Sequence, residues 1–200
     1  MKWSDVTLNQ FLELQEIMKI EDDTDKMLSL AELFFGEDVT ALPLPEFNKK
    51  LKELDFLQTE VPTNHIVKKV TINGHDYTID ALLGHVSTAQ YVDFTNYMKS
   101  ENNIDKVLSV FFIPKGHKYN DGYDTEEVIK DMGSLPIDIA LSESFFFSRQ
   151  FARFIKIFRS YSIKQLKKTD LPKDVKKNLA KVVEDSVNLV LYPLSLNSAK

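Results

Sequence analysis

Four histidines are the first residues of this sequence that could bind a metal or move a proton: His65, His75, His85 and His117. The first three lie ten residues apart, a spacing that matches no helical or strand pattern of metal ligands. The chain has no cysteine, which excludes thiolate zinc sites, iron–sulfur ligation, disulfide bonds and a cysteine nucleophile. We interpret the histidines as ordinary surface or core residues and expect no metal and no cofactor.

The loop 114–124 (PKGHKYNDGYD) gathers lysine, histidine, tyrosine and aspartate, the side-chain types of an active site. Catalysis requires a base within hydrogen-bonding reach of a nucleophile, or a pocket around both, and one loop shows neither. The alternative is a structured turn in which glycines supply positive φ and Tyr119 and Tyr123 hold the loop against the body. We favour the turn. Nucleotide-binding, zinc-protease and nucleophile-elbow motifs are also absent from the sequence, so no enzymatic activity is expected.

The acidic run 21–25 (EDDTD) carries oxygen ligands of the kind that Ca²⁺ prefers. It lacks the glycine at the sharp turn and the bidentate glutamate that complete an EF-hand loop. Carboxylates also stabilise the positive N-terminal end of a helix. We interpret this run as a helix cap and first turn.

The elements that must position these residues are mostly helical. Apolar side chains recur at helical spacing over 7–20, 23–35, 45–57 and 88–98, and in a long segment from Ile137. Residues 66–72 and 75–79 are β-rich runs separated by Asn73-Gly74, the strongest short signal for a β-hairpin. A buried helix is predicted over 107–113 (VLSVFFI), a short one over 125–132, and a final amphipathic one after a break near Pro172, using Val175, Leu179, Val182, Val183 and Val187.

The expected fold class is therefore mostly α (α+β), in two parts. Residues 1–161 form a compact helical domain with one small inserted β-hairpin (66–79), and residues 162–200 form a basic C-terminal helical extension. The N-terminus lacks the uninterrupted apolar run of a signal peptide. No segment approaches eighteen consecutive apolar residues, so no transmembrane segment is predicted.

Charge is divided unevenly along the chain, whose net charge is −5. Residues 1–60 carry six Lys/Arg against fourteen Asp/Glu, a balance of −8. Residues 149–181 carry eleven Lys/Arg against two Asp, a balance of +9. Such polarity suggests two ends that meet different partners or two ends that attract each other, and the alternative is a pair of merely solvated faces.

The segment 145–161 (FFFSRQFARFIKIFRSY) combines aromatic and cationic side chains. On a helix, one continuous stripe is formed by Phe147, Phe151, Phe154, Phe158 and Tyr161, whereas Arg149, Arg153, Lys156 and Arg159 fall off it. This pattern is typical of a membrane-surface helix and equally of a core helix with a solvated basic face. Because the segment follows several helices that need something to pack on, we favour the core helix over partner docking and lipid binding. Nucleic-acid contact, if any, would be non-specific and made by the lysine-rich segment 164–181.

Five motifs occur in a fixed order over about residues 3–155. They are Trp3-Ser4-Asp5-Val6-Thr7-Leu8, Ile72-Asn73-Gly74-His75-Asp76-Tyr77, Thr88-Ala89-Gln90-Tyr91-Val92-Asp93, the run from Phe112-Ile113-Pro114 to Tyr123-Asp124, and Leu135-Pro136-Ile137 with Ala140-Leu141 and Phe145-Phe146. In this order they resemble a group of small, cysteine-free proteins encoded in the structural gene blocks of tailed double-stranded DNA phages. Such proteins are similar to tail-assembly chaperones or, in crAss-like phages, to the cargo proteins of the portal-and-tail region. The lysine-rich extension after Tyr161 is less typical of them.

The resemblance implies a non-enzymatic virion protein, made in the host cytoplasm and packaged at the portal or tail, that contacts portal or tail proteins and copies of itself. The alternatives are a cytoplasmic tail-assembly chaperone absent from the mature virion, and a membrane-active protein delivered into the host. The docking surfaces expected are the hairpin, the tyrosine loop and the basic C-terminal segment. The candidate docking residues are Tyr119, Tyr123, Arg149, Arg153, Arg159, Lys164, Lys167, Lys168, Lys176 and Lys177.

Overall fold

The computed structural model describes residues 1–36, 39–79, 86–99 and 103–181, without the side chains of Thr40, Phe154, Ile155, Phe158 and Arg159. The described chain is mostly α with a small three-stranded antiparallel sheet, which confirms the expected fold class. His85 and the last three valines expected in the final helix lie outside the described residues.

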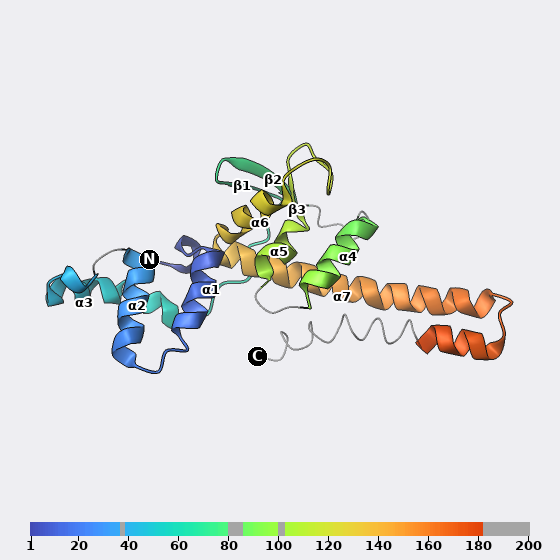
Figure 1. Ribbon diagram of the computed structural model, residues 1–200, viewed down its shortest axis with the longest axis horizontal. Coiled ribbons are helices and arrows are strands. Elements are labelled where there is room, and N and C mark those ends of the chain that lie inside the picture. Colours follow the sequence, from blue (N-terminus) through green and yellow to red (C-terminus); the bar gives the residue numbers. More distant parts are fainter. Residues whose placement is uncertain (37–38, 80–85, 100–102, 182–200) are drawn as a thin grey trace.

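An N-terminal helical unit forms one end of the molecule (Figure 1). It contains η1 (Trp3–Asp5), α1 (Leu8–Ile17), α2 (Asp23–Phe35), η2 (Val39–Ala41), α3 (Leu44–Lys52) and η3 (Asp55–Gln58). The carboxylate of Asp22 accepts hydrogen bonds from the backbone N–H groups of Thr24 and Asp25, so part of the acidic run is the N-cap of α2, as predicted. Thr7 and Gln10 form a capping box that fixes the start of α1.

The indole of Trp3 joins the ends of this unit. Its ring lies edge-on against Phe56 at 5.1 Å between centroids, and its Nε1–H donates to the backbone oxygen of Thr59 at 3.2 Å. The backbone of Val6 and Leu8 also bonds to residues at the start of the longest helix, because Leu8 N–H donates to the Leu135 oxygen and Ile137 N–H donates to the Val6 oxygen, each at 2.8 Å. The N-terminal unit is therefore fixed to the rest of the body through backbone hydrogen bonds.

The hairpin consists of β1 (Lys69–Ile72) and β2 (His75–Ile79), paired antiparallel. Asn73 and Gly74 both have positive φ, 50° and 87°, as a type I′ turn requires. A third strand, β3 (Phe112–Pro114), pairs antiparallel with β2. The prediction of one continuous helix over 107–113 was wrong, since α5 (Ile104–Ser109) ends before the chain turns into β3.

Four helices surround the main core: α4 (Thr88–Tyr97), α5, α6 (Thr125–Gly133) and α7 (Ile137–Lys168). Their apolar sides meet at a cluster of phenylalanines. Phe111 stacks on Phe147 with ring centroids 3.9 Å apart, and Phe94 lies 4.1 Å from Phe151. The first half of α7 is thus a core helix, as expected for Phe147 and Phe151, which are 1% and 0% exposed.

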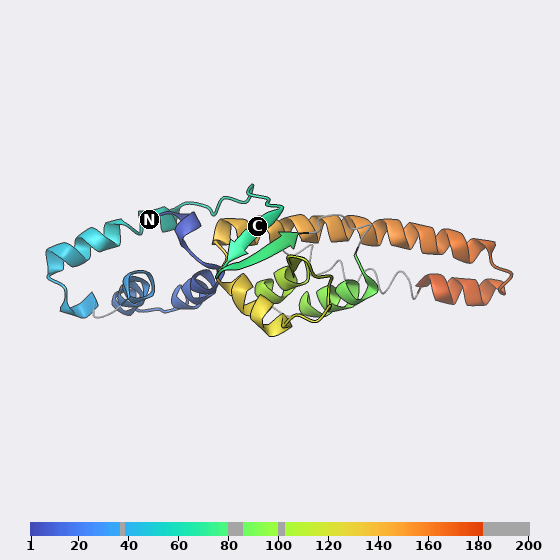
Figure 2. The same ribbon diagram turned by 90° about the horizontal axis from the view of Figure 1, so that it is seen from above.

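The second half of α7 leaves the body and projects along the long axis of the molecule (Figures 1 and 2). Beyond a short turn, the chain forms a further helical segment over the described residues 173–181, so the predicted break near Pro172 is confirmed. The domain boundary predicted after residue 161 falls inside α7, which is continuous from Ile137 to Lys168. We refer to residues 156–181 as the arm.

Candidate functional site

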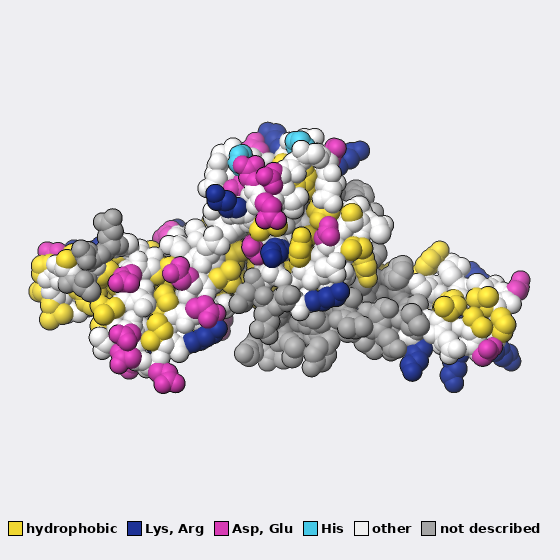
Figure 3. Space-filling model, in the orientation of Figure 1, with side chains coloured by type: hydrophobic (Ala, Val, Ile, Leu, Met, Phe, Trp, Pro, Cys, Tyr) yellow, Lys and Arg dark blue, Asp and Glu magenta, His cyan; other side chains and the backbone are white. Residues whose placement is uncertain are grey.

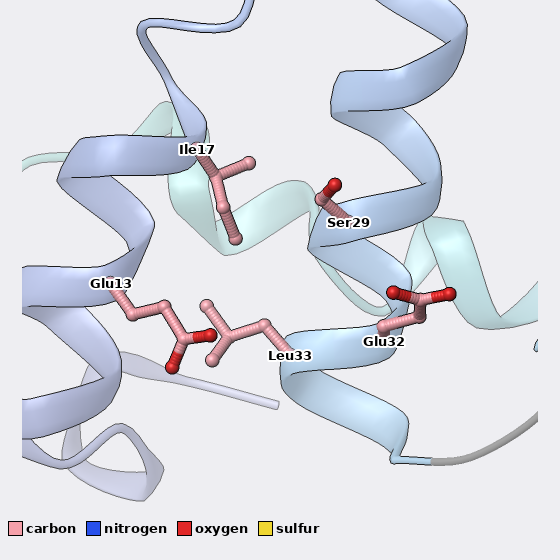
Figure 4. Close-up of a pocket in the computed structure, with 5 residues that line it drawn as sticks. All are labelled: Glu13, Ile17, Ser29, Glu32 and Leu33. Atoms are coloured by element: carbon pink, nitrogen blue, oxygen red, sulfur yellow. The ribbon is translucent and has the colours of Figure 1, made fainter.

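A groove between α1 and α2 is hollowed into the N-terminal unit (Figure 4). Its volume is about 440 Å³, and it is lined by Glu13 and Ile17 of α1 and by Ser29, Glu32 and Leu33 of α2. The side chains of Glu13, Ile17 and Leu33 point into the gap between the two helices. We call these five residues the head groove.

The helical spacing of the sequence explains this arrangement. Glu13 and Ile17 are four residues apart and therefore share one face of α1, while Ser29 and Leu33 do the same on α2. Ile17 is buried and Leu33 half-buried, so the floor of the groove is apolar. Both glutamates are exposed: Glu13 reaches into the gap, whereas the carboxylate of Glu32 lies on the side of α2 that is turned away from Glu13 (Figure 4).

Neither glutamate of the head groove has an ion-pair partner among the described residues. Other carboxylates of this unit do, since Glu16 lies 2.6 Å from the ammonium of Lys19 and Asp23 lies 3.6 Å from that of Lys26. The groove therefore presents uncompensated negative charge beside an apolar floor. This chemistry suits an apolar side chain flanked by cations, that is, a basic amphipathic helix.

The arm carries surface of the complementary kind. Ile157 and Tyr161 are 61% and 60% exposed, although the sequence pattern placed Tyr161 on the buried stripe. That placement was wrong for Tyr161, because this part of α7 lies beyond the described core of the body. Lys164 and Lys168 continue the same face of the helix at spacings of three and four residues. We call Ile157, Tyr161, Lys164 and Lys168 the arm stripe.

The candidate docking residues predicted from sequence fall in three places. Five of them lie on the arm, where the Nζ of Lys176 donates to the backbone oxygen of Lys167 at 3.4 Å: Lys164, Lys167, Lys168, Lys176 and Lys177. Arg149 and Arg153 are exposed on the first half of α7. The side chain of Arg159 is outside the described part of the chain.

The two tyrosines belong to the loop between β3 and α6 and lie away from the arm. The Tyr119 hydroxyl donates to Asp93 at 2.7 Å, and burial together with this bond raises the pKa of the phenol. Tyr123 is half-buried, and its hydroxyl accepts a hydrogen bond from the Asn120 N–H. Gly116 and Gly122 have φ of 89° and 74°. The interpretation of this loop as a structured turn is confirmed.

A second hollow, of about 520 Å³, lies beside the hairpin and includes His75, Tyr77 and Glu127. Behind it is the buried carboxylate of Asp131, which accepts hydrogen bonds from Tyr77 at 2.6 Å, from His75 at 2.7 Å and from Asn73 at 2.9 Å. Burial acts to raise the pKa of Asp131, but these donors together hold that pKa below its usual value. The bond to Asp131 raises the pKa of His75.

The hydrogen bonds to Asp131 are better suited to holding the hairpin against α6 than to catalysis. The Tyr77 hydroxyl is committed to Asp131, and burial raises its pKa, so it does not supply a nucleophile at neutral pH. His75 Nδ1 is engaged by the same carboxylate. Sequence reasoning missed the network because Asp131 approaches the hairpin only through tertiary packing.

Another group of polar side chains, on α7, holds the connection between η3 and β1. His65 Nδ1–H donates to Asp138 at 2.7 Å, and its backbone N–H donates to the hydroxyl of Ser142 at 3.1 Å. Val67 N–H donates to Glu143 at 2.6 Å. Three positions on the first turns of α7 therefore hold this extended segment. Across the ranges that the structure describes, no group of three or more His, Cys, Asp or Glu side chains is arranged to hold a metal ion.

No family model, no curated protein and no solved structure matches the chain. Within the described ranges, no helix combines the length and the hydropathy needed to cross a bilayer.

Proposed function

We propose that this chain is a non-enzymatic virion protein of a tailed phage, made in the host cytoplasm and packaged in several copies at the portal or tail. The resemblance carried by the five ordered motifs suggests this class of protein. The structural observation that supports it best is the arm, which leaves the folded body and exposes both apolar and basic side chains. A projecting helix of this kind buries its surface against another protein chain.

The distribution of charge supports the same proposal. Acidic side chains gather over the N-terminal unit, and basic side chains are prominent at the far end of the arm (Figure 3). A chain with two oppositely charged ends can contact different neighbours at each end, as a subunit of a multi-copy assembly does. The polar networks around Asp131 and Glu143 hold elements together and need no substrate.

One observation favours a second candidate, the cytoplasmic tail-assembly chaperone. A chaperone of this kind shields an apolar partner and should expose apolar surface when free. Ile157, Tyr161, Leu171 and Leu179 are large apolar side chains that are 39% to 61% exposed on the arm. Both candidates use the arm as a docking element, and they differ in whether the chain remains in the finished particle.

Quantitative mass spectrometry of purified, nuclease-treated particles separates the two. The virion proposal predicts several copies of this chain per particle in a fixed ratio to the portal protein. A value near zero, with abundant chain in the lysate of infected cells, would refute the virion proposal and support the chaperone.

A further inference from the structure

We propose that the arm of one copy of this chain docks into the head groove of a second copy, so that copies associate head to tail. The occupant of the groove is the arm stripe, Ile157, Tyr161, Lys164 and Lys168. The inference goes beyond the proposed function and does not rest on it, because it concerns contacts that the purified chain makes with itself.

The two surfaces are complementary in the types of their side chains. The head groove has an apolar floor at Ile17 and Leu33, with the exposed Glu13 beside it and the exposed Glu32 on the outer side of α2. The arm stripe has two exposed apolar side chains followed by two exposed lysines on one helical face. An amphipathic helix that lies in a groove between two helices uses apolar anchors on one face, and Ile157 and Tyr161 have the i, i+4 spacing of such anchors.

Charge complementarity selects a copy of this chain as the partner. The segment that contains the groove carries a balance of −8 over residues 1–60, and the segment that contains the arm carries +9 over residues 149–181. The groove glutamates have no cationic partner among the described residues. The arm stripe supplies two ammonium groups beside its apolar anchors, so the contact pairs these charges and covers the apolar surface of both sides.

The contact has to form between chains and not within one. The N-terminal unit and the arm lie at opposite ends of the long axis, with the sheet and α4 to α6 between them (Figures 1 and 2). Because α7 is one continuous helix from the core to Lys168, the arm stripe cannot reach the groove of its own chain without breaking that helix. Head-to-tail contacts are heterologous and generate a ring when the rotation closes and an open chain when it does not.

Charge reversal tests the contact on the full-length chain by sedimentation equilibrium. The head variant is Glu13→Lys with Glu32→Lys, and the arm variant is Lys164→Glu with Lys168→Glu. Each variant alone should associate on the order of ten-fold or more weakly than the wild type, because like charges then face each other. A mixture of the two variants should associate again, since the basic arm of the first meets the acidic groove of the second and the reversed pair is also complementary.

Matched controls keep the charge change and move it off the proposed surfaces. Glu53→Lys with Glu60→Lys changes two exposed residues of the same acidic unit outside the groove. Lys156→Glu with Lys167→Glu changes two exposed arm residues off the stripe. Both controls should stay within about three-fold of the wild type, whose own association should weaken between about 0.1 M and about 1 M salt. Controls that weaken association as much as the head and arm variants would overturn the proposal.

The absence of cysteine allows a direct test of proximity. When Ser29→Cys and Tyr161→Cys chains are mixed and oxidised, the mixed disulfide should dominate the dimers on a non-reducing gel. A mixture of Glu53→Cys and Tyr161→Cys should give only background dimer. A wild-type chain that stays monomeric at about 0.1 M salt and close to about 1 mM, or a cross-link no stronger than the control, would refute the head-to-tail contact. Absence of the chain from virions would refute the proposed function and leave this contact untouched.

Discussion

Among the carboxylates that the structure describes, Glu143 is the one least exposed to water. Its side chain is fully buried, its Oε1 accepts a hydrogen bond from Val67 N–H, and its Oε2 has no partner among the described residues. Burial raises the pKa of this carboxyl group, and the bond from Val67 opposes that shift only in part. A group with a raised native pKa binds more protons when folded, so its contribution to stability is full below the unfolded pKa and falls as pH rises through the native pKa.

Glu143→Gln should therefore gain stability relative to the wild type as pH rises. The amide keeps an oxygen that accepts from Val67 N–H and carries no charge to desolvate. We expect the difference in the free energy of unfolding, variant minus wild type, to become more positive by on the order of 1 kcal/mol between about pH 4 and pH 8. Urea unfolding at several pH values measures this difference.

Glu53→Gln is the matched control for this titration, because Glu53 is exposed on the N-terminal unit. Its difference from the wild type should stay nearly constant over the same pH range. A Glu143→Gln curve that runs parallel to the control would contradict the assignment of a raised pKa to Glu143.

At the scale of elements, α7 changes its role part of the way along its length. Phe147 is buried in the main core, while Ile157 is exposed on the arm, although both belong to one continuous helix. Phe147→Ala should lower the free energy of unfolding by about 3–5 kcal/mol, because it removes a stacked ring and leaves a cavity beside Phe111.

Ile157→Ala provides the comparison and should change the free energy of unfolding by less than about 0.5 kcal/mol. Chemical denaturation of both variants at high salt, where self-association is suppressed, checks the difference. Comparable losses for the two variants would mean that the second half of α7 packs against the body.

The sequence predicts an element well where the signal for it is local. The caps at Thr7 and Asp22 and the turn at Asn73-Gly74 are local signals, and the structure confirms the acidic cap and the hairpin predicted from them. The run 107–113 was assigned wrongly because a short, wholly apolar segment has the same pattern as a buried helix and as a buried strand. Its strand character comes from pairing with β2, which no local pattern encodes.

The candidate site was only partly predictable for a related reason. The lysines of the arm were identified because they are frequent in the sequence after Tyr161. The opposite net charges of residues 1–60 and 149–181 indicated two ends that could attract each other. The head groove was missed, because it exists only where α1 packs against α2 and brings Glu13 near Leu33. Helical periodicity also predicts that the helix from Phe147 to Tyr161 is amphipathic. It cannot predict at which residue this helix leaves the core.

At the scale of the whole molecule, the arm makes the chain elongated (Figure 2). A compact chain of this length would have a radius of gyration of about 16 Å. Small-angle X-ray scattering of the monomer, recorded at high salt to suppress head-to-tail contacts, should give a clearly larger value. A radius of gyration near that of a compact sphere would mean that the arm folds back in solution.

The continuity of α7 also determines how the molecule responds to mechanical force. A tension applied to the end of the arm acts along a helix of 32 residues, about 48 Å long, that leads directly into the aromatic core. The contacts of this helix with Phe94 and Phe111 lie in its first half, so a force from the arm passes along the exposed turns before it reaches them. A chain drawn by its C-terminal side through a narrow channel would therefore load α7, the helix that carries the buried Phe147 and Phe151, before the other elements of the body.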